Sequence, residues 1–346
     1  MSGDLQILRF PQSKSIDAVR FLSPLSAFSR FIVAAVHDPD TAGSAIEIHA
    51  LTPPDLHLQS SCPTPSRISS LRASQTPQKP VIAAATLAGS LHFLFADPVE
   101  ASLESELSLS DKSFHGGPIS AIDLEGSGCE CVSVGEDGRV NLVKVGESRL
   151  NCGLVSDSRG LVSYTAVRWG SPTEFATGGL GHTVQWWDQR KPGGPVSQFK
   201  GNWTQGSTSG IVHSIDIHPS RKHVCVVGGS SGTLFAWDLR WQQQPILLSG
   251  VGVDETTHAA SESEVWEVQY DSFMQSSNAG TASSARILPV MICSEDGILA
   301  VLEKGEEPLD ILSEPCAING FDIDLQNPSD VICCLEWETI VFIMRP

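Results

Sequence analysis

Residues 132–145 read "VSVGEDGRVNLVKV", and a close variant, "CSEDGILAVLEK", returns at residues 293–304. In the first copy, apolar residues alternate with small or polar ones on both sides of Asp137 and Gly138. Period-two alternation predicts half-buried strands. Asp-Gly between two such runs indicates a hairpin, because tight hairpin turns need positive φ and glycine adopts it at little cost. Both stretches are therefore predicted to be β-hairpins.

The same hairpin frame recurs along the whole chain. A turn residue with apolar residues two and four places later occurs at seven positions, which are Ser44, Gly89, Gly138, His182, Gly232, Gly297 and Glu338. By subtraction, the steps between them are 45, 49, 44, 50, 65 and 41 residues. The longest step contains the Ser/Ala-rich stretch "MQSSNAGTASSA" at 274–285. A period of about 40–45 residues with four strands each is typical of WD40 repeats.

Two repeats carry the Trp-Asp signature outright, "TVQWWDQR" at 183–190 and "TLFAWDLR" at 233–240. In both, the Trp stands five residues after the turn position, and the structural WD residues are Trp187, Asp188, Trp237 and Asp238. Seven phased hairpins with this signature predict an all-β fold, a seven-bladed WD40 β-propeller.

The two ends of the sequence fit a closed ring. The last repeat, 315–346, supplies only three strands, and "DLQILRFP" at 4–11 supplies a fourth. Pairing the N-terminal strand with the last blade removes sheet edges that would otherwise template aggregation. We therefore expect one propeller over residues 1–346.

Composition excludes several classes of function. The chain has 346 residues and a formal charge of −18, which argues against direct nucleic-acid binding by clustered Lys and Arg. Its apolar runs are shorter than the ~18 residues that a membrane-spanning helix needs, so no membrane insertion is expected. Nine cysteines without a framework of spacings indicate reduced thiols in the cytosol or nucleus.

The sequence offers no catalytic, cofactor-binding or metal-binding pattern. "GGSSG" at 228–232 matches the nucleophile elbow around Ser230, but a β-patterned run follows it where that motif needs a helix. His115, Ser133 and Asp137 instead fit the hydrogen-bonded structural set of a WD repeat. The prediction is a protein that is not an enzyme and needs no cofactor.

Four segments together resemble one family. These are "VSVGEDGRVNLVKV", "HPSRKHVCVVGGSSGTLFAWDLR" (218–240), "SEVWEVQYD" (263–271) and "CSEDGILAVLEK". They look like the nucleoporin 43 family of small WD-repeat nucleoporins. The resemblance implies a scaffold subunit of the Y-shaped outer ring of the nuclear pore complex, in the nuclear envelope. It further implies a monomer held by other outer-ring nucleoporins, one with an α-helical solenoid, that supports pore assembly and transport of mRNA and protein.

Propellers usually bind partners through the face that carries the tight hairpin turns. The residues expected on that face are Glu136, Asp137, Arg139, Glu264, Trp266, Glu295 and Asp296. Trp266 is the sharpest candidate, because Trp and Arg dominate interface hot spots. The alternatives are that Trp266 packs between adjacent blades and that Arg139 is a surface charge.

A second class of function also fits the sequence. Trp187 to Arg190 and Trp237 to Arg240 both match the W-D-x-R box of substrate receptors for cullin-RING ubiquitin ligases. In that reading, Arg190 and Arg240 contact the ligase adaptor. The fold does not decide between the two, since propellers host many unrelated partners.

Overall fold

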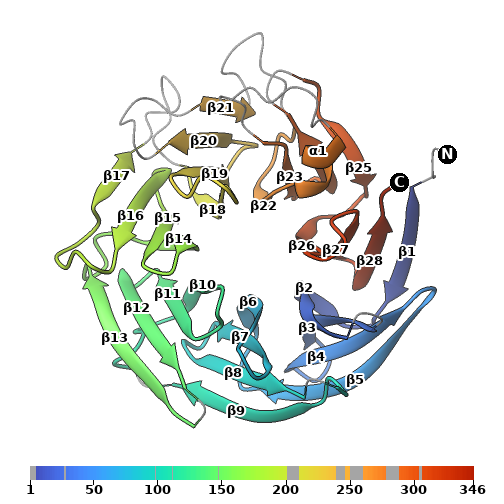
Figure 1. Cartoon of the computed structure of the whole chain (residues 1–346), viewed down its shortest axis with the longest axis horizontal. Coiled ribbons are helices and arrows are strands. Elements are labelled where there is room, and N and C mark those ends of the chain that lie inside the picture. The colour runs from blue at the N-terminus through green and yellow to red at the C-terminus, as the bar shows by residue number, and fades with distance from the viewer. Residues whose placement is uncertain are drawn as a thin grey trace.

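The computed structural model describes residues 5–26, 29–97, 99–110, 112–146, 148–200, 210–238, 246–249, 260–277, 288–303 and 306–346. Seven four-stranded antiparallel sheets are arranged in a ring (Figure 1). The architecture is an all-β propeller with seven blades, and this confirms the predicted fold class.

Within each blade the strands run from the inside of the ring to its outside. Blade 1 consists of β2 (Ser15–Ser26), β3 (Ser29–Asp38), β4 (Gly43–Thr52) and β5 (Asp55–Thr64). Blade 2 consists of β6 (Ile68–Gln75), β7 (Pro80–Thr86), β8 (Leu91–Ala96) and β9 (Leu103–Leu109). Blade 3 consists of β10 (Ile119–Leu124), β11 (Glu130–Gly135), β12 (Arg139–Val145) and β13 (Leu150–Asp157).

Blades 4 to 6 continue the same order. Blade 4 consists of β14 (Tyr164–Ser171), β15 (Glu174–Gly179), β16 (Thr183–Asp188) and β17 (Ser197–Lys200). Blade 5 consists of β18 (Val212–Ile217), β19 (Val224–Gly229), β20 (Leu234–Asp238) and β21 (Ile246–Ser249). Blade 6 consists of β22 (Val265–Tyr270), β23 (Val290–Ser294), β24 (Ile298–Leu302) and β25 (Leu309–Ser313), with the short helix α1 (Ser272–Ser277) after β22.

Blade 7 joins the two ends of the chain. It contains β26 (Ile318–Ile323), β27 (Asp330–Leu335) and β28 (Thr339–Met344), and β1 (Gln6–Pro11) pairs with β28 as its outer strand. The register runs antiparallel from Gln6 opposite Met344 to Pro11 opposite Thr339. The predicted closure is therefore present, and the N- and C-terminal strands lie side by side (Figure 1).

Backbone conformation at the turns follows the repeat frame at six of its seven positions. Positive φ occurs at Gly89, Gly138, His182, Gly232, Gly297 and Glu338. In blade 1 the predicted turn position, Ser44, lies inside β4, and the residue with positive φ is Ala42, at 54°. The difference arises because Asp38 accepts hydrogen bonds from Asp40 N and Thr41 Oγ1, which shapes a longer turn before the strand.

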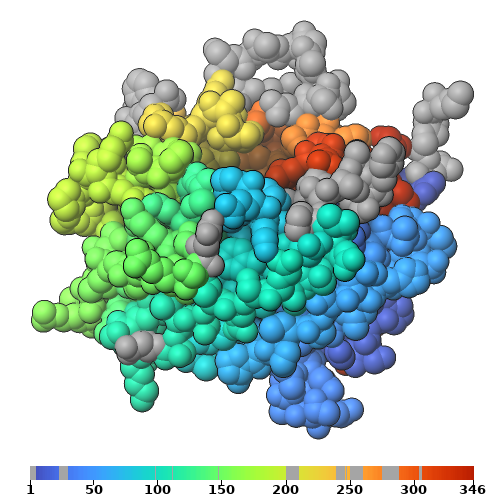
Figure 2. Space-filling view, turned by 60° about the horizontal axis from the view of Figure 1, so that its bottom comes forward, coloured from blue at the N-terminus to red at the C-terminus, as the bar shows by residue number. Residues whose placement is uncertain are grey.

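The hydrophobic core lies between the blades. Between blades 3 and 4, for example, Val132 and Val140 pack in one cluster with Trp169, Phe175 and Trp187. The middle strands of a blade, such as β7 and β8, are buried along their whole length between the neighbouring blades, whereas outer strands such as β13 are mostly exposed. The space-filling view brings the outer strands of blades 2 and 3, in teal and green, toward the viewer (Figure 2).

Candidate functional site

Asp137 fastens the turn between β11 and β12 to the loop that precedes β10. Its carboxylate accepts the backbone N–H of Gly116 at 2.8 Å and lies 3.2 Å from His115 Nδ1. On its other side, His115 Nε2 lies 3.0 Å from Ser133 Oγ. His115, Ser133 and Asp137 thus form the hydrogen-bonded set that the sequence pattern indicates. The carboxylate of Asp137 is engaged in holding the fold.

The charge states of this set follow from burial and from its hydrogen bonds. Burial lowers the pKa of His115, and the attraction of Asp137 only partly offsets it. Burial also opposes ionisation of Asp137, yet the N–H groups of Gly116 and Arg139 lower its pKa below the usual value. A neutral imidazole beside an ionised carboxylate is therefore the resting state near neutral pH.

Arg139 and Glu136 occupy the same turn in different ways. The guanidinium of Arg139 donates to the carbonyl oxygens of Lys112 and Ser113, at 3.1 and 3.0 Å. It therefore ties β12 to the loop that precedes β10. Glu136, by contrast, is exposed at the tip of the turn.

The turn of blade 6 repeats this construction with serines. Asp296 accepts hydrogen bonds from Ser261 Oγ at 3.1 Å and from Ser294 Oγ, and its own N–H donates to Ser263 Oγ. Its neighbour Glu295 is exposed and bonds through its backbone to the preceding loop. Asp296 therefore holds the turn of blade 6 to the loop that precedes β22, as Asp137 holds the turn of blade 3 to the loop that precedes β10. Glu295 occupies the position in blade 6 that Glu136 occupies in blade 3.

Trp266 lies on the innermost strand of blade 6, at the wall of the central channel. Its indole lies 4.8 Å from the ring of His213 on blade 5, and the imidazole bonds through Nε2 to the carboxylate of Glu264. The side chain is partly buried against the core between blades 6 and 7. The indole therefore packs between blades and also borders the channel.

The seven candidate residues share one face of the ring in two separate groups. Each blade brings the turn after its second strand next to the start of its first strand. In blade 6 the N–H of Glu295 donates to the carbonyl oxygen of Glu264, at 2.9 Å. One group therefore lies on blade 3 and the other on blade 6, with blades 4 and 5 between them.

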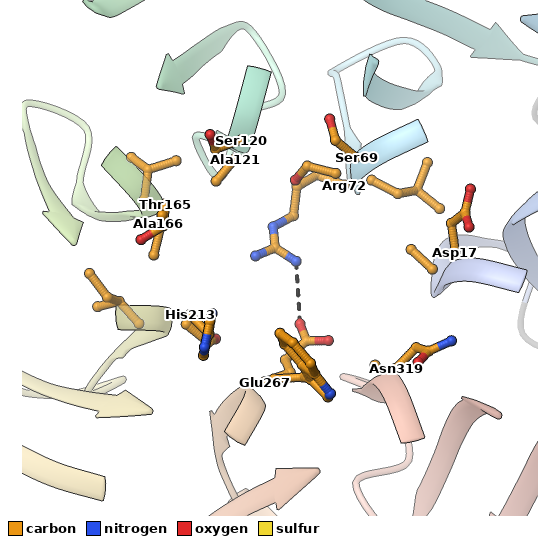
Figure 3. Close-up of a pocket in the computed structure, with 18 of the residues that line it drawn as sticks. Asp17, Ser69, Arg72, Ser120, Ala121, Thr165, Ala166, His213, Glu267 and Asn319 are labelled. Atoms are coloured by element: carbon orange, nitrogen blue, oxygen red, sulfur yellow. Dashed lines mark hydrogen bonds and ion pairs between the residues drawn. The ribbon is translucent and has the colours of Figure 1, made fainter. Parts of the chain in front are cut away.

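The channel through the ring is lined by residues of all seven innermost strands. These residues enclose a cavity of about 130 Å³. Figure 3 shows Asp17, Ser69, Ser120, Thr165, His213 and Asn319 around it. Arg72 and Glu267 point toward each other across the opening, with 3.4 Å between Arg72 Nη1 and Glu267 Oε1.

One buried arginine, two partly buried arginines and three carboxylates form a network at the level of this cavity. Arg20 donates to Glu267 at 2.7 Å and Arg168 to Asp216 at 3.0 Å, while Arg72 lies 3.2 Å from Asp123. Burial opposes ionisation of Glu267, but Arg20 and Arg72 lower its pKa nevertheless. Each arginine of the network thus has a carboxylate beside it, as a buried ionic cluster requires, although Arg72 Nε contacts Asp123 as an ion pair without a hydrogen bond.

The same carboxylates join successive blades through the backbone. Asp123 accepts the N–H of Trp169 in the following blade at 2.8 Å, and Asp216 accepts that of Tyr270 at 2.8 Å. Asp322 closes the series by accepting the N–H of Phe21 in blade 1, at 2.9 Å. Each of these bonds spans a boundary between two blades.

Sequence reasoning missed this channel network, although a signal was present. The innermost strands all carry a charged or amide side chain at the fifth residue of a common frame. These residues are Arg20, Arg72, Asp123, Arg168, Asp216, Gln269 and Asp322. Glu267 is the exception in the third place, where the other strands carry Ala, Ser or Gly. Aligning "SAIDL", "HSIDI" and "NGFDI" would have found the aspartates.

The WD residues of blades 4 and 5 lie between blades. Trp187 is buried, donates from Nε1 to Thr177 Oγ1 at 2.9 Å, and stacks on Phe175 with ring centroids 5.9 Å apart. Trp237 is buried in the next inter-blade cluster, 5.2 Å from the ring of Phe199.

Asp188 and Asp238 end the strands β16 and β20. Arg190 donates to both oxygens of Asp188, at 2.8 and 2.9 Å, and the hydrogen bond from Arg190 lowers the pKa of Asp188 to about 2. The guanidinium of the first W-D-x-R box is thus held by the aspartate of its own box. Arg240, in the second box, lies outside the described residues.

The described part of the chain has neither a metal-binding cluster nor a membrane-spanning helix. No group of three or more His, Cys, Asp or Glu side chains there could hold a metal ion. No helix in the same ranges is long and apolar enough to cross a membrane.

Known proteins similar to this chain are nucleoporins. The nuclear pore complex protein NUP43 of Arabidopsis thaliana is 55% identical over an alignment of 364 positions that covers 100% of this chain and 99% of that protein. Nucleoporin Nup43 of Homo sapiens is 29% identical over 200 residues, or 55% of this chain and 48% of the human protein. The Mus musculus Nup43 is 30% identical over 194 residues, covering 55% and 43%. No protein-family model matches the chain. The near-complete alignment to the Arabidopsis protein, together with the seven-bladed ring, shows that this chain belongs to the nucleoporin 43 family.

Proposed function

We propose that the protein is a non-enzymatic scaffold subunit of the outer ring of the nuclear pore complex. The observation that carries the proposal is the 55% identity to a nuclear pore complex protein over the full length of both chains. The protein's place is accordingly the nuclear pore in the nuclear envelope. It acts there through protein–protein contacts that support pore assembly and the transport of mRNA and protein.

The partners we propose are other outer-ring nucleoporins, among them one with an α-helical solenoid. The chain would join them as a monomer within a hetero-oligomeric complex. Its net charge of −18 favours protein surfaces with basic patches over nucleic acid. No cofactor is needed for such a role.

The proposed contact surface is the face that carries the hairpin turns. Glu136 and Glu295 are exposed at the tips of two turns on this face, and Trp266 borders the channel mouth between them. Asp137, Arg139 and Asp296 would contribute by holding the turns in place, since their polar groups are already bonded within the chain. Glu264 orients His213 next to Trp266.

The complex is tested by affinity purification of a tagged copy expressed in cells at its natural level. We expect outer-ring nucleoporins to copurify at moderate salt, and the tagged protein to outline the nuclear rim. A cullin adaptor recovered without nucleoporins would overturn the proposal.

The surface is tested with charge reversals on opposite faces. Glu136→Lys combined with Glu295→Lys should reduce recovery of the nucleoporins. The matched control combines Glu306→Lys with Glu307→Lys, two exposed residues in the loop between β24 and β25 at the other face. Equal recovery with both double variants would place the contact elsewhere. Trp266→Ala with an intact fold and unchanged recovery would remove the indole from the contact.

The ubiquitin-ligase alternative is not favoured. The similar proteins are nucleoporins, and the guanidinium of Arg190 is bonded to Asp188. The W-D-x-R pattern at this position is explained by an ion pair within the box, because Arg190 donates to Asp188 at the end of the WD strand.

A further inference from the structure

The outermost strand of blade 3, β13, presents an unusual edge. It pairs with β12 on one side only and forms the outer rim of the blade (Figure 1). Residues 150–156 contain no charged side chain, and Leu154 and Val155 are 59% and 37% exposed. A long, uncharged edge with exposed apolar residues is a template for pairing with another strand.

The other outer strands described in the structure carry the features that normally block such pairing. Four of them contain charges or proline, namely β5 (Asp55, Pro63), β9 (Glu104, Glu106), β25 (Asp310) and β1 (Arg9, Pro11). The fifth, β17, is only four residues long, whereas β13 has eight residues and a single charge, Asp157, at its last position. The sixth, β21, is only four residues long. Charges, proline and short length are the common means of protecting an edge, so β13 stands apart within this ring.

A cavity of about 240 Å³ lies directly beside β13. Leu154 and Val155 form one side of it, the loop from Gln189 to Gly194 forms the other, and Phe175 and Trp187 contribute to its lining. Leu142 also lines the cavity, and the residue paired with it on β13 is Gly153. Since paired residues point to the same face of a sheet, the missing side chain of Gly153 leaves this space open.

The surroundings of the edge are basic in a strongly acidic protein. Residues 139–191 contain seven Lys or Arg and four Asp or Glu, a net charge of +3 by subtraction, against −18 for the whole chain. Lys144 on β12 and Lys191 on the rim of the cavity have side chains that are 65% and 70% exposed, although they lie 3.3 Å from Glu130 and 4.0 Å from Asp188. Charge complementarity favours an acidic ligand at this edge.

We propose that β13 is a docking edge for an extended segment of a partner protein. The segment adds to blade 3 as a fifth strand and places one large apolar side chain in the cavity between blades 3 and 4. It carries acidic residues on either side of that anchor. Strand addition combines main-chain hydrogen bonds for affinity with a side-chain pocket for specificity. This surface is separate from the hairpin-turn face and from the residues proposed there.

The test uses purified full-length protein and a capped nine-residue peptide labelled with a fluorophore. The peptide has two glutamates at each end and valine, threonine, leucine, threonine and valine between them. We expect saturable binding by fluorescence anisotropy, with slower amide exchange over residues 151–156. Val155→Glu should weaken binding at least about tenfold, because an anchor side chain loses its apolar contact on the wall of the cavity. A peptide with lysines in place of the glutamates should bind more weakly.

Two further variants make the result decisive. Gly153→Val should fill the cavity and weaken binding, and it should fold, because an added Cβ would come no closer than 3.9 Å to Leu142 O. Leu325→Glu makes the same kind of change at an exposed apolar residue of blade 7, 94% exposed, and should leave binding unchanged. Absence of binding, equal affinity for Val155→Glu and Leu325→Glu, or exchange protection away from β13 would overturn the proposal. A homodimer protecting β13 would also overturn it, since the edge would then serve a second copy. None of these outcomes depends on nucleoporin recovery.

Discussion

Arg20 of blade 1 donates to Glu267 of blade 6 across the central channel, with 2.7 Å between Arg20 Nη2 and Glu267 Oε1. The pair bypasses blade 7 and therefore links blades that do not neighbour each other in the ring. Arg20 also donates to the carbonyl oxygen of Phe321, and Glu267 accepts the N–H of the same residue. Blade 7, which contains both ends of the chain, is thus held between the partners of one buried ion pair.

Removing the carboxylate charge of Glu267 should be strongly destabilising. Glu267→Gln leaves Arg20 and Arg72 buried with less compensation, and breaking a buried pair in this way costs about 3–5 kcal/mol of unfolding free energy. Chemical denaturation of the purified protein measures it. The matched control is Glu104→Gln, which breaks an exposed ion pair with Lys79 and should cost no more than about 1 kcal/mol. Similar losses of unfolding free energy in both variants would show that the channel network stabilises the fold no more than an exposed ion pair does.

Deleting residues 1–11 should destabilise the whole ring and not one end alone. The deletion removes β1, exposes the edge of β28, and takes away Leu8 and Phe10, which pack against the core between blades 7 and 1. Two such partly buried side chains contribute about 3 kcal/mol, so the melting temperature should fall by about 4 °C.

Amide exchange checks whether that effect spreads beyond blade 7. Exchange should become faster in blades 1 and 6 as well, because the ring is closed through blade 7. Arg9→Gln is the control, since it keeps β1 and removes only the partly exposed ion pair with Glu314. Faster exchange confined to β28 would contradict the expectation.

Gly138→Ala and Gly160→Ala should separate two effects on stability: the cost of a positive φ for alanine and the cost of a steric clash with its Cβ. Both glycines have positive φ, 80° and 76°, so alanine at either costs about 1–2 kcal/mol. An added Cβ at Gly160 meets nothing within 4 Å, whereas at Gly138 it would meet Val162 O at 2.8 Å and Gly160 N at 3.0 Å. Denaturation should therefore show a clearly larger loss for Gly138→Ala. Equal losses would mean that the turn relaxes away from its neighbours.

The fold was predictable because its information is local and repeated. Each hairpin carries its own turn residue and its own alternation of apolar and polar residues. The last repeat has only three strands, and the N-terminal strand supplies the fourth. The turn of blade 1 was misplaced by two residues, because Asp38 shapes it through side-chain bonds that the frame did not include. The helix α1 was not predicted, since six residues give no helical periodicity.

The channel and the β13 edge were harder to foresee, because both depend on which blades become neighbours. Arg20 and Glu267 are 247 residues apart, and nothing in either strand alone indicates that they pair. The aspartates at 123, 216 and 322 recur in the sequence, but their backbone partners are known only once the blades are in order. The topology groups the candidate contact residues on one face, and their contact with a partner stays a prediction. Which of them hold turns could be seen only from their bonds.

Acidification below neutral pH should weaken the fold through its buried histidines. Burial lowers the pKa values of His115, His182 and His218 in the folded state. A group whose folded pKa is depressed contributes stability above its unfolded pKa, about 6.5 for histidine, and that stability is lost as pH falls toward the folded pKa. Each such group changes the unfolding free energy by up to about 1.4 kcal/mol per pH unit in this window.

The contribution of His115 can be isolated by comparing wild type with His115→Gln between pH 7.5 and 5.5. The variant should be less stable at pH 7.5, because the link from Asp137 to Ser133 is weakened, and its stability should fall less steeply with acidification. Burial raises the pKa values of Asp216 and Asp322, so acidification stabilises the fold through these two groups. Wild type and variant both contain them, so their effect cancels when the two stability profiles are subtracted. His57→Gln, on the exposed face of β5, should keep the wild-type slope. An unchanged slope in His115→Gln would mean that folding does not lower the pKa of the imidazole, contrary to the expected effect of its burial.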